Sequence, residues 1–286
     1  MKLLLYFLLL IPTVMMAQKQ DKRLQREVAK LVEGYEGDIG IYIKSLKTEK
    51  EVSINADTVF PTASIVKVPI LIGIMNKINR GELSYHQSLV YNDSVKYSGD
   101  EATMASMKNG TKIELAEVIM LMLTMSDNTA SLWLQAIAGT GTAINKEMDD
   151  LGFIHTKVNS KTPARETDRK QYGWGQTTPK EMATIFEQLY RGQIIDDSAS
   201  QKMIRMLGRN FWDEEALSQI PATTFIASKT GAVDASRNEI LLVMSKEPYL
   251  LSIFTKNNKD KSWNSDNAAW VLTRKLSKIV FEHFED

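Results

Sequence analysis

The chain has 286 residues, of which 43% are hydrophobic, so it can bury a full core in one large domain or two closely packed ones. Its 35 basic and 35 acidic residues give a formal net charge of zero. Neither sign forms a long run, which argues against nucleic acid or an anionic membrane as a partner. The chain has no cysteine, which excludes disulfides and thiol nucleophiles, and its three histidines lack metal-ligand spacing. We therefore expect no cofactor or metal, a monomer, and small molecules or peptides as partners.

The first residues have the pattern of a targeting segment. Lys2 precedes an apolar run from residue 3 to residue 16, and the small Ala17 is followed by polar residues. This pattern predicts a signal peptide at residues 1–17, cleaved after Ala17, and an exported, periplasmic or secreted protein. The run is shorter than the roughly 20 residues of a membrane-spanning helix, so an uncleaved anchor is the alternative. After cleavage we expect no stable membrane insertion.

The segment after the signal predicts a helix and then an antiparallel hairpin. Apolar residues recur at helical spacing between residues 24 and 32. Ile39, Ile41 and Ile43 then alternate with other residues, and a second short alternation follows at residues 52–54, across a turn at residues 47–50.

Ser64 and Lys67 lie three residues apart in a segment that is apolar on every side, and such a helix is normally buried. A buried lysine must pair with acceptors or lose its charge, and a lysine with a lowered pKa can act as a general base. Residues 64 and 67 share one helix face, so Lys67 could take the proton of the Ser64 hydroxyl. Pro69 requires distortion unless it falls in the first turn. The alternative is that Ser64 caps the helix and Lys67 reaches solvent.

A second polar signature, Ser126-Asp127-Asn128, falls at a break between two helical runs. Thr111 and Glu114 form a capping-box pattern that predicts the start of the first run. In this loop Ser126 could relay a proton to a leaving nitrogen, and Asn128 could hold Lys67 and a substrate amide. The alternative is a simple cap on the second helix. The same tripeptide recurs at residues 265–267 before the last helix, where capping explains it fully.

A third signature, Lys229-Thr230-Gly231, follows the apolar residues 225–228 and is predicted to end the first strand of a returning β region. A strand edge beside a cleft can bind substrate as an added strand, and a glycine there allows close backbone approach. Lys229 would supply positive charge, and Arg237 could add a second cation for a substrate carboxylate. The alternative is a polar turn at the end of an exposed strand.

Further strands are expected at residues 239–244 and 249–255, followed by a closing helix with Leu272, Leu276 and Ile279 on one face. Strands from both ends of the chain can then share one sheet, while the middle forms a helical lobe. The predicted fold class is α+β. Its sheet lobe comprises residues 18–61 and 210–286, and its helical lobe comprises residues 62–209.

The three signatures occur in the order used by penicillin-recognising serine enzymes, and the chain resembles the class A β-lactamase family and its serine-hydrolase relatives. The resemblance spans Phe60-Pro61, residues 95–98, residues 126–130, Thr177-Thr178-Pro179 and residues 229–237. It implies a five-stranded antiparallel sheet flanked by helices plus an all-helical lobe, with the site in the cleft between them.

The resemblance also implies roles for individual residues. Ser64 would be the acylated nucleophile and Lys67 its proton partner, with Ser126 and Lys229 in leaving-group protonation and carboxylate binding. The backbone N–H groups of Ser64 and Ala232 would form the oxyanion hole. Tyr97 would wall the cleft, and Thr230 and Gly231 would lie along the substrate.

One departure concerns the loop at residues 164–175, where the family carries a Glu that activates the deacylating water and an Asn four residues later. Glu166 is present, but Lys170 stands where that Asn would be. Asp168 is an alternative base, and both carboxylates could instead form solvated ion pairs with the basic residues around them.

The functions left open differ in how the acyl group leaves. With a well-placed base the protein would be a β-lactamase hydrolysing the β-lactam amide through a Ser64 acyl-enzyme. Without that base it would be a related serine hydrolase or D-alanyl peptidase that β-lactams acylate with slow turnover, acting on a cell-wall peptide. A non-catalytic penicillin-binding sensor is the third reading.

Overall fold

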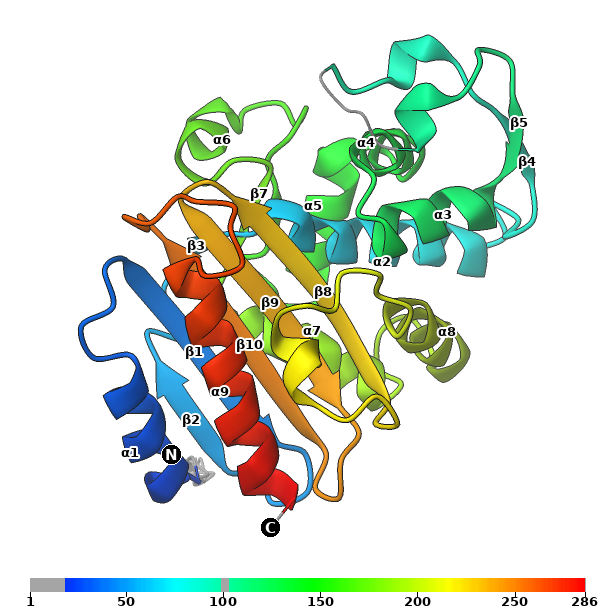
Figure 1. The fold of residues 1–286 in the computed structure, drawn as a ribbon. Helices are drawn as coiled ribbons and strands as arrows, with labels where there is room; N and C mark the ends of the chain where they lie inside the picture. Colours follow the sequence, from blue (N-terminus) through cyan, green and yellow to red (C-terminus); the bar gives the residue numbers. More distant parts are fainter. Residues whose placement is uncertain (1–18, 99–102, 286) are drawn as a thin grey trace, which may run out of the picture.

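The computed structural model describes residues 19–98 and 103–285, and its centre is a five-stranded antiparallel sheet with helices on both faces (Figure 1). The strand order is β2-β1-β10-β9-β8, so the two N-terminal strands and the three C-terminal strands share one sheet, joined where β1 pairs with β10. The strands are β1 (Asp38–Ser45), β2 (Glu51–Ile54), β8 (Ile226–Val233), β9 (Ser236–Val243) and β10 (Tyr249–Lys256). The predicted α+β fold class is confirmed. The predicted signal peptide, residues 1–17, lies outside the described residues.

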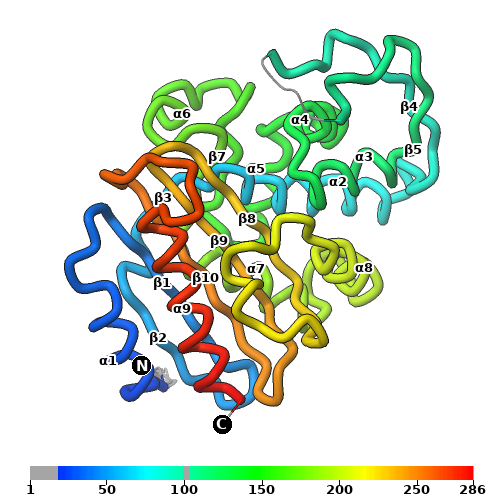
Figure 2. The backbone as a smooth tube through the Cα atoms, in the orientation of Figure 1, coloured from blue at the N-terminus to red at the C-terminus, as the bar shows by residue number. Residues whose placement is uncertain are grey.

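One face of the sheet is covered by α1 (Lys22–Leu31), α9 (Ala268–Glu285) and the short 3-10 helix η4 (Ala216–Gln219). The alternating residues Ile39, Ile41 and Ile43 of β1 point to this face and pack against the apolar sides of both long helices. The helices α1 and α9 are neighbours there (Figure 2), and His283 of α9 bonds to the Asp21 carboxylate at 3.0 Å.

The other face packs on α7 (Pro179–Tyr190), which contacts β1, β9 and β10. The core between them continues without a break into the other helices, apart from the helix at residues 166–172, which has no buried residue. These helices are α2 (Lys67–Asn79), α3 (Leu115–Thr124), α4 (Asn128–Ile137), α5 (Thr140–Asp150), α6 (Glu166–Tyr172) and α8 (Asp197–Leu207), with 3-10 helices η1 (Ala63–Val66), η2 (Asp93–Val95) and η3 (Met104–Ser106). The division into two lobes at residues 61 and 209 stays a prediction. Among the described residues, no helix is both long and apolar enough to cross a membrane.

Two small sheets were not predicted. One has the order β3-β7-β6 and the other pairs β4 with β5; their strands are β3 (Phe60–Pro61), β4 (Ser88–Val90), β5 (Lys112–Glu114), β6 (Lys157–Val158) and β7 (Gly175–Thr177). The predicted capping box at Thr111 and Glu114 is wrong. Residues 112–114 are extended because they pair with β4, and the box is formed three residues later by Glu114 and Glu117.

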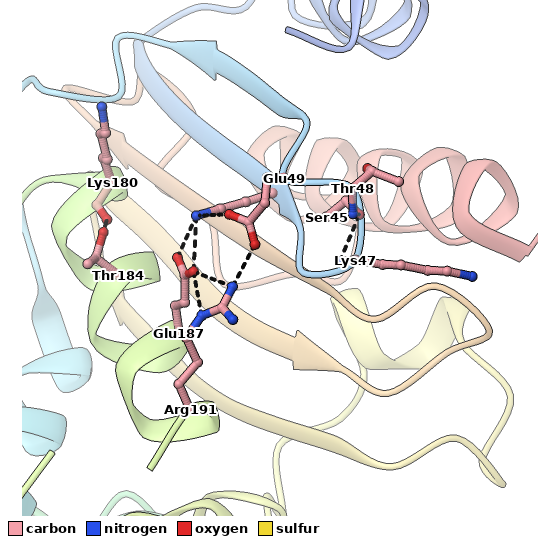
Figure 3. Close-up of polar contacts among 9 residues, drawn as sticks. Ser45, Lys47, Thr48, Glu49, Lys180, Thr184, Glu187 and Arg191 are labelled. Atoms are coloured by element: carbon pink, nitrogen blue, oxygen red, sulfur yellow. Dashed lines mark hydrogen bonds and ion pairs between the residues drawn. The ribbon is translucent and has the colours of Figure 1, made fainter. Parts of the chain in front are cut away.

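A closed ring of ion pairs ties the β1–β2 hairpin to α7 (Figure 3). Lys44 of β1 lies 2.8 Å from Glu49 in the hairpin turn and 2.9 Å from Glu187 of α7. Arg191 closes the ring, at 2.6 Å from Glu49 and 2.9 Å from Glu187. Lys44 and Glu187 are mostly buried, with 13% and 14% of their side chains exposed, so water screens this ring less than an open surface pair.

Candidate active site

Ser64 lies on η1, and this 3-10 helix leads directly into α2, which begins at Lys67. The two helices are apolar on every side and buried, as the sequence predicted, and the Lys67 side chain is fully buried with them. Pro69 is the third residue of α2, within the first turn, where a missing backbone N–H costs no helical hydrogen bond. The helix therefore continues past Pro69 while Ser64 stays half-buried at its start.

The Lys67 amine is surrounded by polar partners that explain its burial. Its Nζ donates to the Ser64 Oγ at 3.0 Å, to the Ser126 Oγ at 2.9 Å and to the Asn128 Oδ1 at 3.0 Å, and it also bonds to the Ser126 carbonyl oxygen. Lys67 does not reach solvent, so the snorkelling alternative is wrong. The contact with Ser64 is the one that a proton transfer between the two side chains requires.

The Ser126-Asp127-Asn128 segment both caps α4 and faces the site. Asp127 is the N-cap, accepting from the backbone N–H of Ala130 at 2.8 Å and of Met104 at 2.9 Å. Its neighbours Ser126 and Asn128 are thereby turned toward Lys67, with Ser126 in the left-handed region at φ 57°. The copy at residues 265–267 caps the last helix, because Asn267 Oδ1 accepts from the N–H of Ala269 at 3.0 Å, and its Ser265 lies in the wall of the second pocket described below.

Lys229 extends the chain of contacts from the sheet. Its Nζ donates to the Ser126 Oγ at 3.2 Å and to the Thr230 carbonyl oxygen at 3.0 Å, and its side chain is fully buried. Burial lowers the pKa of Lys229 to about 7, opposed by the nearby Glu239 carboxyl. Ser64, Lys67, Ser126 and Lys229 thus form a continuous series of hydrogen-bonded side chains.

The third signature lies inside its strand rather than at the strand's end. β8 continues to Val233 because residues 229–233 pair with residues 236–240 of β9. The polar-turn alternative is therefore wrong. β8 is the edge strand of the sheet, as the substrate-binding hypothesis requires.

The backbones of β8 and η1 approach each other closely at Gly231. A Cβ added to Gly231 would lie 3.0 Å from the Ser64 nitrogen and 2.5 Å from the Thr62 carbonyl oxygen, so β8 and η1 touch backbone to backbone. The backbone N–H and C=O of Arg237 both bond to the Thr255 hydroxyl on β10. Arg237 is paired with Ala232 of β8, and because its backbone groups bond to β10, the two residues form a non-hydrogen-bonded pair. The Ala232 N–H therefore points away from β9, toward the edge of the sheet where Ser64 lies.

Two pockets meet at Ser64, and both also reach Ala232. The first pocket, of about 470 Å³, is walled by Tyr97, Asn128 and Trp174. The Tyr97 and Trp174 rings meet edge to face, with centroids 5.0 Å apart.

The second pocket, of about 830 Å³, contains Ser126, Thr230 and Gly231 and continues between the sheet and α9, beside the loop that precedes η4. Trp174 in the first pocket, and Trp212 and Trp263 in the second, were missed by the sequence analysis because single tryptophans in loops carry no spacing signal.

Arg237 lies in the wall of the second pocket, but its charge is already engaged. Its guanidinium donates to the carbonyl oxygens of Val233, Ser236 and Ser262, and only 1% of the residue is exposed. The guanidinium carbon lies 4.3 and 4.7 Å from the ring centroids of Trp263 and Trp270. Arg237 can add positive potential near Thr230, whereas a direct ion pair with substrate would require these bonds to change.

Glu166 and Asp168 are not brought together with Ser64. Glu166, the first residue of α6, has an exposed side chain, and Asp168 pairs with Arg165 at 3.2 Å. Neither carboxylate lines either pocket; α6 contributes Gln171 and Tyr172 from its other end. Their role in deacylation stays a prediction to which the geometry adds no support.

The chain belongs to the beta-lactamase enzyme family, whose model matches residues 23–284. It is 21% identical to the β-lactamase VEB-1 of Pseudomonas aeruginosa, over 99% of this chain and 97% of that protein. It is 26% identical to a β-lactamase of Streptomyces fradiae, over 94% and 89% of the two chains. The resemblance drawn from the three signatures is therefore confirmed, and the family supports a serine hydrolase.

Solved structures share the fold at low sequence identity. The structure of PBP-A superposes with a TM-score of 0.82 at 22% identity, covering 94% of this chain and 98% of that one. The TLA-1 extended-spectrum β-lactamase superposes with the same TM-score at 14% identity, covering 92% and 99%. At such identities these structures support the fold alone, and the reaction has to be inferred from the side chains of the site.

Proposed function

We propose that the protein is a serine β-lactamase that hydrolyses the β-lactam amide through an acyl-enzyme on Ser64. The observation that carries this proposal is the series of contacts from Ser64 Oγ to Lys67 Nζ at 3.0 Å, from Lys67 to Ser126 Oγ at 2.9 Å and from Ser126 to Lys229 Nζ at 3.2 Å. It joins a nucleophile to a base, and the base to a donor for the leaving group, at the meeting point of two pockets.

In the acylation step the Ser64 oxygen attacks the β-lactam carbonyl carbon, and neutral Lys67 takes the hydroxyl proton. The backbone N–H groups of Ser64 and Ala232 stabilise the negative charge on the carbonyl oxygen. The carbon–nitrogen bond then breaks while Ser126 gives its proton to the leaving nitrogen and recovers one from Lys67. Lys229 and Thr230 hold the substrate carboxylate, and water finally hydrolyses the Ser64 ester.

A second candidate is a related serine hydrolase or D-alanyl peptidase that β-lactams acylate with slow turnover. The observation that favours it is the exposure of Glu166 and the pairing of Asp168 with Arg165, because fast ester hydrolysis needs a base beside the attacking water. In that case Lys67, the basic side chain bonded to Ser64, would be left to activate water.

A chromogenic cephalosporin separates these candidates. For a β-lactamase we expect many turnovers per protein molecule and loss of all turnover in Ser64→Ala. A burst of one equivalent, with a covalent adduct seen by mass spectrometry and little further hydrolysis, would assign the slow hydrolase or peptidase instead. Absence of both turnover and adduct would refute the Ser64 chemistry itself.

We also propose a two-lobed monomer, exported after cleavage at residue 17, with the site between the sheet lobe and the helical lobe. The named relatives are β-lactamases, which act on small molecules, and this supports a β-lactam or a cell-wall peptide as the partner. N-terminal sequencing of the exported protein and its elution volume in gel filtration test these points.

A further inference from the structure

The two pockets that meet at Ser64 differ in size and in lining, and the second, of about 830 Å³, is the larger of the two. Ser126, the proposed donor to the leaving nitrogen, lines the second pocket and not the first. Asn128 and Tyr97 line the first pocket and not the second. On the proposed mechanism, the first pocket therefore receives the acyl side of the substrate, and the second receives whatever the leaving group carries.

Two exposed tryptophans from different loops wall the second pocket. Trp212, between α8 and η4, is 43% exposed, and Trp263, between β10 and α9, is 58% exposed. The Trp212 ring N–H donates to the Met125 carbonyl oxygen at 3.3 Å, and the Trp263 ring N–H donates to Asp234 at 2.9 Å. Both indoles are thus anchored by their polar edge. Arg237 covers part of the Trp263 ring at 4.3 Å and Phe211 meets the Trp212 ring edge to face at 5.1 Å, so the exposed remainder of each ring is the surface open to a planar ligand.

Two carboxylates, Glu214 and Glu215, and two arginines, Arg237 and Arg274, lie in the wall of this pocket beside Glu239. Glu215 forms an ion pair with Arg274 at 2.6 Å, and the Arg237 guanidinium donates to carbonyl oxygens while keeping its charge. Burial raises the pKa of Glu239 to about 8, so its carboxyl is largely protonated at neutral pH. Beyond the Thr230 end, where the substrate carboxylate is proposed to bind, opposite charges in equal number and a protonated Glu239 favour an uncharged occupant over an ion.

The floor of the pocket carries unused hydrogen-bonding capacity. Glu239 Oε2 accepts from the N–H of Ala216 at 3.1 Å, whereas Glu239 Oε1 is buried without a hydrogen-bond partner among the described residues. Arg237 Nε, two residues earlier on the same face of β9, is also buried without a hydrogen-bond partner among the described residues. Such groups are costly unless a ligand or water satisfies them, and a carboxyl O–H and an Arg N–H both donate.

We propose that the second pocket binds an uncharged heteroaromatic ring on the leaving-group side of the substrate, with the ring against Trp212 and Trp263 and an acceptor atom directed at Glu239. This inference rests on the proposed function for the assignment of the leaving side. It makes the two tryptophans determinants of specificity, with no part in bond breaking.

The test compares two cephalosporins with the same acyl side chain, one carrying a 3-methyl group and the other an uncharged heteroaryl-thiomethyl group. Trp212→Ala and Trp263→Ala should each lower the acylation efficiency for the heteroaryl compound about tenfold, as expected for a lost aromatic contact. The methyl compound should change less than about twofold. Phe225→Ala, which removes an exposed aromatic outside both pockets, should leave both rates unchanged.

Glu239 is tested by a conservative pair. Glu239→Gln keeps a donor and should retain the preference for the heteroaryl compound, whereas Glu239→Leu should lose it, with circular dichroism confirming that both variants fold. Equal effects of the tryptophan substitutions on both cephalosporins, or no effect on either, would overturn the proposal while leaving the Ser64 chemistry intact.

A second measurement does not depend on acylation. The uncharged S-methyl thioether of the heteroaryl group is titrated into Ser64→Ala protein while tryptophan fluorescence is followed. Saturable quenching that disappears in Ser64→Ala/Trp212→Ala would support the pocket even if no cephalosporin acylates Ser64. Absence of any saturable signal up to millimolar thioether would overturn it.

Discussion

Gly231→Ala is the sharpest perturbation of the site, because the added methyl group would meet backbone atoms. The new Cβ would lie 2.5 Å from the Thr62 carbonyl oxygen, about 0.9 Å short of the 3.4 Å at which ordinary contact begins. Neither contact partner is a flexible side chain, so β8 and η1 must separate by most of that distance. The two predicted oxyanion donors, the N–H groups of Ser64 and Ala232, would separate with them.

A misplacement of this size is expected to lower the acylation rate about 100-fold, or about 2.7 kcal/mol in the barrier. The fold should survive, since β8 is an edge strand that can shift. Acylation is measured by rapid mixing with a chromogenic cephalosporin. Gly110→Ala is the matched control: its Cβ meets nothing within 4 Å, and its φ of +87° makes the change cost stability without touching the site.

The control should melt at a lower temperature and acylate at the wild-type rate. A Gly231→Ala protein that acylates within threefold of wild type would refute the inference that the close approach of β8 and η1 builds the oxyanion site.

Three further predictions follow from the charged groups. Acylation efficiency should fall as pH rises through about 7, because Lys229 in the free enzyme then loses the proton that binds the substrate carboxylate; a flat profile from pH 6 to 9 would contradict this. In the proposed β-lactamase, Glu166→Gln or Asp168→Asn should accumulate a stable acyl adduct, according to which carboxylate activates the deacylating water; turnover within about twofold in both variants would show that neither side chain is that base. Glu187→Gln should lower the free energy of unfolding in urea by about 1–3 kcal/mol, while loss of the exposed Arg23–Glu27 pair costs under about 0.5 kcal/mol; equal losses would mean that burial of the ring adds nothing.

The residues with distinctive local patterns were the ones that the sequence located. Lys67 stood out because a helix that is apolar on every side is normally buried, and a charged residue within it then needs polar partners. In the structure the Lys67 amine is buried with four oxygen partners. The strands were identified by the alternation of apolar and polar residues. This pattern indicates a strand with one buried face and does not depend on which distant segments pack against it.

Features that depend on distant partners were the ones missed. Residues 112–114 read as a helix start because the pairing with β4 that holds them extended comes from a segment some 20 residues away. The orientation of Glu166 depends on how Arg165 is anchored by Asn159 and Gln176, which no local pattern encodes. The second pocket arises where the loops before η4 and α9 meet, and its tryptophans have no relation to one another in the sequence.

The contact between η1 and β8 has a consequence for solubility as well as for chemistry. An edge strand offers unpaired backbone groups to which another chain can add, and β8 is such an edge. At Gly231 that edge is blocked by the 3-10 helix that carries Ser64, so a second copy of the chain cannot pair along its full length. The segment that presents the nucleophile therefore also protects the sheet against edge-to-edge aggregation.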